Sequence, residues 1–261
     1  MATFPAPYAL RSFRYWVFQY GRTWRGSVVS TVLFPVLFLA SMGVGLGTLV
    51  DSSSSRGVEG HSYLVFLAPG LLAATAMQTG VGESTYPVMG AIKWVKTYHA
   101  MLATPLGVLD VMVGHLLYIA ARVLGGAAVF LAVMTAFGAV DGPLALLTLP
   151  AALLTGMAFA APVAAYSAVT ENDAGFAVLM RFVITPLFLF GGVFYPISQL
   201  PLVLELVAYV TPLWHGVALS RGLALGTVSG IAALGHALYL SAWIAGGTWF
   251  AARNYRRRLA V

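Results

Sequence analysis

The sequence predicts an all-α integral membrane protein with six transmembrane helices. Of its 261 residues, 60% are hydrophobic and only 8% are charged, whereas a soluble domain carries about a quarter charged residues. So few charges would not cover the surface of a soluble protein, and the apolar excess must therefore face lipid. The apolar residues also gather in uninterrupted stretches of about 20 residues, the length that crosses a bilayer.

Six such stretches follow one another, each ended by a polar run or a turn. They cover about residues 28–50, 63–81, 108–138, 144–169, 176–194 and 231–252. The whole chain, residues 1–261, forms one transmembrane domain. It consists of an amphipathic interface helix within residues 1–27, a six-span core over 28–252 and a basic cytosolic tail at 253–261.

The interface helix is predicted from the pattern of Tyr8–Arg25. At about 100° per residue, Arg11, Arg14, Arg22 and Arg25 share one face, and aromatic and aliphatic residues share the opposite face. Such a helix lies in the membrane interface with its apolar side toward the acyl chains. Its basic side either anchors the topology or docks on a cytosolic partner, for which Arg14 and Arg22 are the candidates.

Residues 83–107, between the second and third spans, form a longer connection than a simple loop requires. Apolar residues at helical spacing predict an amphipathic helix over 88–103, and Thr104-Pro105 would cap the next helix. The segment is either a lever on a cytosolic partner or a basic tether. Its candidate partner contacts are Glu83, Lys93, Trp94, Lys96 and Tyr98.

Residues 195–230, between the fifth and sixth spans, are apolar but are interrupted by Pro196, Pro201 and Pro212. The uninterrupted pieces are too short to span, which favours a re-entrant helical hairpin. Two short helices are predicted, over about 199–209 and 212–225. Thr211-Pro212 supplies an N-cap and a first-turn proline for the second of them.

The positions of Lys and Arg predict the orientation. With both termini in the cytosol, ten of the fourteen basic residues lie inside, and only Arg56 and Arg221 lie outside. We expect a multi-pass membrane protein with both termini in the cytosol, and the plasma membrane is its expected location. The net charge of +6 flanks the spans, so lipid rather than nucleic acid is the expected partner.

The sequence gives little support for a catalytic, metal-binding or nucleotide-binding site in this chain. There is no cysteine, no histidine pair at the spacing of a helical metal site and no phosphate-binding GxxxxGK[ST] loop. We therefore expect no catalytic residue, no metal and no cofactor in this chain. A lipid-acting membrane enzyme and a stand-alone channel are the alternatives from other classes.

Seven residues are candidates for a substrate path. Arg122 and Arg181 lie within predicted spans, where a charge costs about 2.5–3.5 kcal/mol. They either snorkel to the cytosolic surface or line an internal path for an anionic substrate. In the outer hairpin, Glu205, His215 and Arg221 either pair with one another or contact substrate. Phe194 and Tyr195, at the start of the hairpin, complete the set.

Three stretches resemble the type-2 ABC export permeases. FGGVFYPISQLP at 190–201, followed by TPLWHG at 211–216 and Arg221, looks like that family's signature after the fifth helix. YLVFLAPG at 63–70 and MLATPL at 101–106 are similar to the branch that exports nodulation factors, which are lipo-oligosaccharides. Polysaccharide exporters and daunorubicin-type drug exporters are related branches.

The resemblance implies that two copies of this permease pair with two copies of a separate ATPase, which binds ATP and Mg²⁺. The interface helix and residues 83–107 would dock on that ATPase. The implied cargo is an envelope amphiphile such as a lipid-linked oligosaccharide or glycolipid, moved out from the cytosolic side. A drug-like compound is the alternative cargo.

Overall fold

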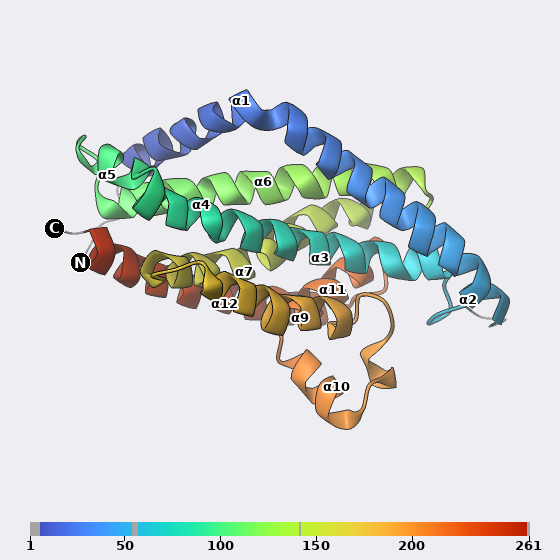
Figure 1. The fold of residues 1–261 in the computed structure, drawn as a ribbon. Helices are drawn as coiled ribbons and strands as arrows, with labels where there is room; N and C mark the ends of the chain where they lie inside the picture. The colour runs from blue at the N-terminus through green and yellow to red at the C-terminus, as the bar shows by residue number, and fades with distance from the viewer. Residues whose placement is uncertain (1–5, 54–56, 141, 260–261) are drawn as a thin grey trace.

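The computed structural model of the chain is a bundle of long helices (Figure 1) and describes residues 6–53, 57–140 and 142–259. No β-strand forms within these ranges. Five helical stretches are long and apolar enough to cross a bilayer: Tyr8–Ser53, Tyr63–Trp94, Val108–Ala136, Pro143–Val169 and Gly230–Leu259. The predicted all-α membrane class is therefore confirmed, with five to six candidate spans.

The first helix unites two elements that the sequence predicted as separate. α1 (Ala6–Phe38) runs without a break into a π-helical segment, Leu39–Leu46, and then into α2 (Gly47–Ser53). The predicted boundary between an interface helix and a first span near residue 27 is therefore not a break in the helix. Instead, α1 bends partway along its length (Figure 1). Residues 1–5 of the predicted interface helix lie outside the described residues.

The predicted helix over 88–103 is also wrong, because the chain divides it into two pieces. α3 (Tyr63–Ser84), α4 (Tyr86–Met89) and the π-helical turn Gly90–Trp94 follow one another as an extension of the second span. Lys96 then adopts a left-handed conformation, with φ at 55°, and the short helix α5 (Thr97–Leu102) starts in a new direction.

The third and fourth predicted spans correspond to α6 (Val108–Ala136) and to a 3₁₀ turn, Pro143–Leu147, followed by α7 (Thr148–Val169). The cap of α6 is not Thr104-Pro105. The Gly107 N–H donates a hydrogen bond to Asp110 Oδ2 over 2.9 Å, and this contact begins the helix.

Small residues let the central helices approach closely. A Cβ built on Gly80 of α3 would lie 2.3 Å from the Gly156 carbonyl oxygen of α7. Because lipid gives no hydrophobic drive between helices, such close backbone contact supplies the packing energy instead. The core therefore lies where α3 and α7 cross, with α6 packed on both.

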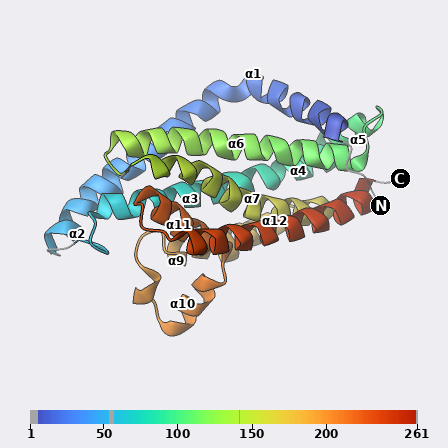
Figure 2. The same cartoon turned by 180° about the vertical axis from the view of Figure 1, so that it is seen from behind.

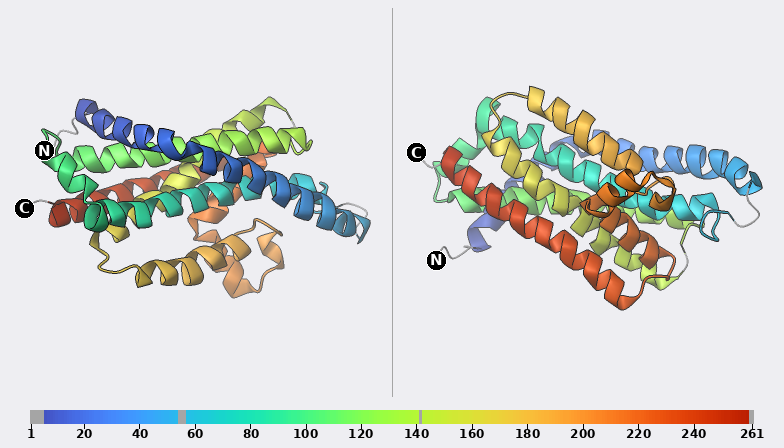
Figure 3. Two further views of the ribbon diagram at one scale, coloured as in Figure 1. Left: turned by 45° about the horizontal axis from the view of Figure 1, so that its top comes forward. Right: turned by 90° about the horizontal axis from the view of Figure 1, so that it is seen from below.

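The fifth predicted span is shorter than expected. α8 (Ala174–Leu179), a π-helical turn (Met180–Ile184) and α9 (Thr185–Phe190) form a 17-residue apolar helix, about 26 Å long at 1.5 Å per residue. The prediction extended it to Phe194, but the helix ends at Gly191-Gly192, where Gly192 has a φ of 80°. α9 lies at the edge of the bundle (Figure 3).

Two short helices follow in the region of the predicted hairpin. α10 (Leu202–Tyr209) and α11 (Pro212–Ala224) meet at 78°. The predicted cap forms, since the Trp214 N–H donates to Thr211 Oγ1 over 3.4 Å. α10 projects sideways from the bundle (Figure 2), whereas α11 packs on α3, α7 and α12.

The last helix, α12 (Gly230–Leu259), includes most of the predicted basic tail. It continues seven residues beyond Ala252, and Tyr255 and Leu259 are buried. The tail is therefore not a separate element, although residues 260–261 lie outside the described residues. The beginning of α1 and the end of α12 lie beside α5, at one end of the bundle (Figures 1 and 2). We call this end the α5 end.

Candidate functional site

An ion-pair network ties three segments together at the α5 end. Glu171, between α7 and α8, accepts hydrogen bonds from Lys93 Nζ and from Arg258, and each ion pair measures 2.8 Å. The hydrogen bond from Lys93 is the main cause of a lowered pKa of the Glu171 carboxyl, with Arg258 adding to it. Only Lys93 was predicted as a site residue. The polar run after α7 and the basic residues of the tail were the signals for the other two.

An aromatic and basic surface lies next to this network. Trp94 is 59% exposed, and Val95 and Lys96 after it are also exposed. Arg14 and Arg22 of α1 are exposed as well. The structure thus leaves four of the seven predicted partner contacts available on the outside of the chain: Arg14, Arg22, Trp94 and Lys96.

Tyr98 is not available, and its prediction as a partner contact is wrong. Its ring is fully buried, and its hydroxyl is hydrogen-bonded to His115 Nδ1 and lies 3.4 Å from the Tyr255 hydroxyl. Burial raises the pKa of Tyr98 well above its ordinary value. Trp16 stacks on His115 with 4.1 Å between ring centroids. This cluster joins α5 to α1, α6 and α12.

Glu83 and Arg122 were predicted for different roles, but they form one ion pair. Arg122 Nε lies 3.0 Å from Glu83 Oε1, and the two side chains are only 19% and 21% exposed. The Arg122 guanidinium also lies over the Tyr20 ring, 4.1 Å from its centroid. Glu83 is therefore no free contact for a partner, and Arg122 is not an uncompensated charge.

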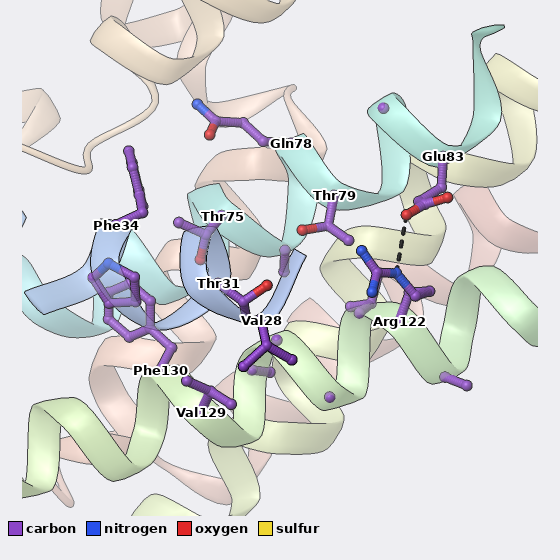
Figure 4. Close-up of a pocket in the computed structure, with 18 of the residues that line it drawn as sticks. Val28, Thr31, Phe34, Thr75, Gln78, Thr79, Glu83, Arg122, Val129 and Phe130 are labelled. Atoms are coloured by element: carbon purple, nitrogen blue, oxygen red, sulfur yellow. Dashed lines mark hydrogen bonds and ion pairs between the residues drawn. The ribbon is translucent and has the colours of Figure 1, made fainter. Parts of the chain in front are cut away.

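This pair lies in a cleft of about 740 Å³ between α1, α3 and α6 (Figure 4). We call it the lateral cleft. Its polar lining includes Thr31, Thr75, Gln78 and Thr79, and its apolar lining includes Val28, Val32, Phe34 and Phe130.

The three charged or titratable residues of the hairpin do not pair with one another, contrary to one of the two alternatives. Arg221 is half-buried and donates to three backbone carbonyl oxygens, those of Phe66, Gly192 and Val193, at 3.1, 2.8 and 3.4 Å. It therefore fixes α11 to α3 and to the turn after α9.

His215 and Glu205 have other partners. His215 Nδ1 lies 2.8 Å from His236 Nδ1, and its Nε2 lies 3.0 Å from the Tyr209 carbonyl oxygen. The Tyr209 hydroxyl donates to Glu205 Oε1 over 3.4 Å. These contacts stay within the hairpin and α12, which the linear sequence did not reveal.

The other path candidates lie apart from the lateral cleft. Arg181 is exposed on the outside of the short helix. Phe194 packs against Phe188 and Phe38 at centroid distances of 5.1 and 6.1 Å. Tyr195 is half-buried at the start of the hairpin. Within the described ranges, no group of three or more His, Asp or Glu residues is placed to hold a metal ion.

Comparison with known proteins matches residues 11–225 to the ABC-2 type transporter family. Nodulation protein J of Rhizobium leguminosarum bv. trifolii is 32% identical over 208 residues, which cover 78% of this chain and 77% of that protein. Nodulation protein J of Sinorhizobium fredii is 29% identical over 223 residues, which cover 84% of this chain and 82% of that protein. Nodulation protein J of Azorhizobium caulinodans is 32% identical over 201 residues, which cover 75% of this chain and 76% of that protein.

Proposed function

The chain belongs to the ABC-2 type transporter family, and from this premise we propose that it is the permease subunit of an ATP-driven exporter. Two copies would pair with two copies of a separate ATPase, which would bind ATP and Mg²⁺. The chain itself then supplies the membrane path and the surface through which ATP hydrolysis moves it.

Six crossings of the plasma membrane agree best with the fold. α1 begins and α12 ends at the α5 end (Figure 1), so the number of crossings must be even. Five long helices alone would give an odd number. The short helix Ala174–Phe190 is the piece that we propose as the remaining crossing, with the α10–α11 hairpin dipping into the membrane and returning.

The α5 end is proposed to face the cytosol. Lys93, Lys96 and the arginines 256–258 gather there, and basic residues concentrate on the cytosolic side of membrane proteins. Both termini would then be cytosolic, on the side where the ATPase is found.

The surface around Trp94 is the observation that carries the proposal. An exposed Trp is typical of an interface anchor, because Trp, Tyr and Arg carry most of the binding energy at interfaces, and Lys96 beside it adds a positive charge. Immediately behind this surface, Tyr98 is buried against α6 and α12 through His115 and Tyr255. A movement of Trp94 and Lys96 would therefore be transmitted through Tyr98 to α6 and α12.

The experiment compares Trp94→Ala with Trp249→Ala, since the two indoles are equally exposed, at 59% and 58%. Only Trp94 lies in the proposed interface. Loss of an anchor costs about 2 kcal/mol, so Trp94→Ala should weaken copurification with the ATPase about 30-fold. Trp249→Ala should leave it unchanged. Equal binding of both variants, or ATP hydrolysis by the permease without a partner, would refute the proposal.

For the cargo we propose an envelope amphiphile such as a lipid-linked oligosaccharide or glycolipid. The resemblance to lipo-oligosaccharide exporters and the match to nodulation proteins J support this class over drugs. Path residues at the exit would come from the hairpin and its start: Phe194, Tyr195, Glu205, His215 and Arg221. Arg181 would lie on the path nearer the cytosolic end of the short helix. ATP-dependent movement of a fluorescent glycolipid in vesicles holding permease and ATPase tests the class. Movement of an amphiphilic drug alone would reassign it.

A further inference from the structure

The lateral cleft has a polar end and an apolar end. Figure 4 shows Glu83 and Arg122 at one end and Phe34 and Phe130 at the other. Thr75 and Glu83 are eight residues apart on α3, which corresponds to a rise of about 12 Å. A cleft of about 740 Å³ with this polarity matches one molecule that has a polar head and an apolar chain.

Hydroxyl groups line the cleft from its polar end toward its middle. Thr75, Thr79 and Glu83 recur every fourth residue and so share one face of α3. The hydroxyls of Thr31 and Thr75 donate to backbone carbonyls of their own helices, which leaves their oxygens as acceptors. The Thr79 hydroxyl forms no hydrogen bond with any described residue. The Thr31 and Thr75 oxygens are therefore free to accept hydrogen bonds from a ligand in the cleft, and the Thr79 hydroxyl is free to donate one.

The floor of the cleft on α6 is open. A Cβ built on Gly125 or Gly126 would meet no atom within 4 Å, and the same holds for Gly82 on α3. The two α6 glycines are therefore not there to bring helices into contact, unlike Gly80 and Gly156. Their effect is to keep space between α1, α3 and α6.

The charge of the head group decides which amphiphile suits the lateral cleft. Because Glu83 neutralises Arg122 at 3.0 Å, an anionic head group gains from the Arg but is repelled by the Glu. An uncharged hydroxyl is the better match, since it donates to the carboxylate and accepts from the guanidinium or from Thr79. The exposed side chains of Val28, Val32 and Phe34 in the cleft provide contact for an apolar chain.

We propose that the lateral cleft binds an uncharged amphiphile with a polyhydroxyl head group. The head lies at the Glu83–Arg122 pair and the chain extends toward Phe34. Given the cytosolic α5 end of the proposed function, the polar end of the cleft is its cytosolic end. The ligand is either the transported molecule or a lipid that stays bound, and both have this chemistry.

The test places a cysteine in the cleft without removing a polar group. Gly126→Cys is suitable because the position is open, and Gly235→Cys on α12 is the matched control, since a Cβ there also meets no atom within 4 Å. The chain has no cysteine of its own. The purified permease is placed in phosphatidylcholine vesicles, alone or with monoglucosyl-diacylglycerol or phosphatidylglycerol of the same acyl chains. The rate of reaction with a membrane-permeant thiol reagent is then measured.

The glucolipid should slow labelling of Gly126→Cys about tenfold, as a bound ligand would, and should leave Gly235→Cys unchanged. Phosphatidylglycerol should protect neither position. Equal protection of Gly126→Cys by phosphatidylglycerol, or no protection beyond that of phosphatidylcholine, would overturn the proposal.

Charge variants test the role of the pair. Glu83→Gln leaves Arg122 unpaired, so phosphatidylglycerol should bind about 10- to 100-fold more tightly, as for a charge-assisted hydrogen bond. The double variant Glu83→Gln/Arg122→Gln restores neutrality, and the preference for the glucolipid should return. If Glu83→Gln does not fold, Thr79→Val keeps both charges and should reduce glucolipid protection. An unchanged preference in all variants would contradict the assignment.

The source of the ligand is decided by adding the ATPase. Protection that falls during ATP turnover identifies the transported molecule, whereas protection that persists identifies a resident lipid. The vesicle experiment with permease alone needs no partner. A failure of ATPase binding would therefore refute the proposed function and leave the cleft result standing, and the reverse also holds.

Discussion

Replacing Tyr98 by phenylalanine should destabilise the protein although it removes a single oxygen atom. The Tyr98 hydroxyl is the partner of His115 Nδ1, and His115 Nε2 has no hydrogen-bond partner among the described residues. Without the hydroxyl, a buried imidazole keeps no partner at all. An unsatisfied buried polar group costs about 1–3 kcal/mol, and the phenyl ring still fills the space beside Trp16 and Tyr255. The expected loss is therefore about 1–3 kcal/mol.

The assay is equilibrium unfolding of the purified permease in mixed micelles with an increasing fraction of dodecyl sulfate, followed by circular dichroism. Tyr86→Phe is the control, because Tyr86 is half exposed and its hydroxyl bonds to no described residue. A surface change of this kind shifts the free energy of unfolding by less than about 0.5 kcal/mol. The double variant Tyr98→Phe/His115→Phe should recover most of the loss, since both polar partners are then gone.

The reasoning would be refuted if Tyr98→Phe were no less stable than Tyr86→Phe. It would also be refuted if the double variant lost the sum of both single losses, because the two groups would then not be coupled. Tyr98→Ala should cost more, about 3–5 kcal/mol, since it also leaves a cavity.

Three further predictions follow from other parts of the fold. Gly80→Ala should cost about 1–3 kcal/mol in the same unfolding assay, because its Cβ would lie 2.3 Å from a backbone oxygen of α7. Gly82→Ala, with open space around it, should cost nothing and should add up to about 1 kcal/mol of stability, because Ala favours the helix more than Gly does. The Glu171 carboxyl should titrate below its ordinary pKa in ¹³C NMR, so its ion pairs are present at neutral pH and are lost only as pH falls through that lowered pKa. Lys93→Met should raise this pKa, and an unchanged value would contradict the contact. Gln199→Cys should react with a membrane-impermeant thiol reagent added outside cells, and reaction only from the cytosolic side would reverse the topology.

The membrane class and much of the helix order could be predicted from the linear sequence. Long apolar stretches can only be satisfied in lipid as helices, so α6 and α7 lie close to their predicted ranges. The Thr211-Pro212 cap was also predictable, because capping depends on neighbouring residues alone. The signature after the fifth helix was sufficient for the family, which the match over residues 11–225 confirms.

Helix boundaries depended on more than local pattern. The basic residues of α1 predicted an interface helix, but they gave no sign that Trp16 and Tyr20 of this part pack on Tyr118 of α6. In the same way the tail after Ala252 stays helical, since Tyr255 is buried in the core and Arg258 is paired. These contacts join residues far apart in the chain, and no window of sequence contains them.

The tertiary structure alone decided which polar residues meet. Glu83 and Arg122 are 39 residues apart, and Tyr98 and Tyr255 are 157 apart. Spacing on one helix places a residue on a face, but it does not say which other helix covers that face. Packing of α3 beside α6 turned two separate candidates into one neutral pair, and packing of α5 on α12 buried a residue that its sequence neighbours suggested was exposed. Composition and periodicity thus determined the kind of protein and the faces of its helices, whereas helix packing determined which faces are paired, buried or left open as a cleft.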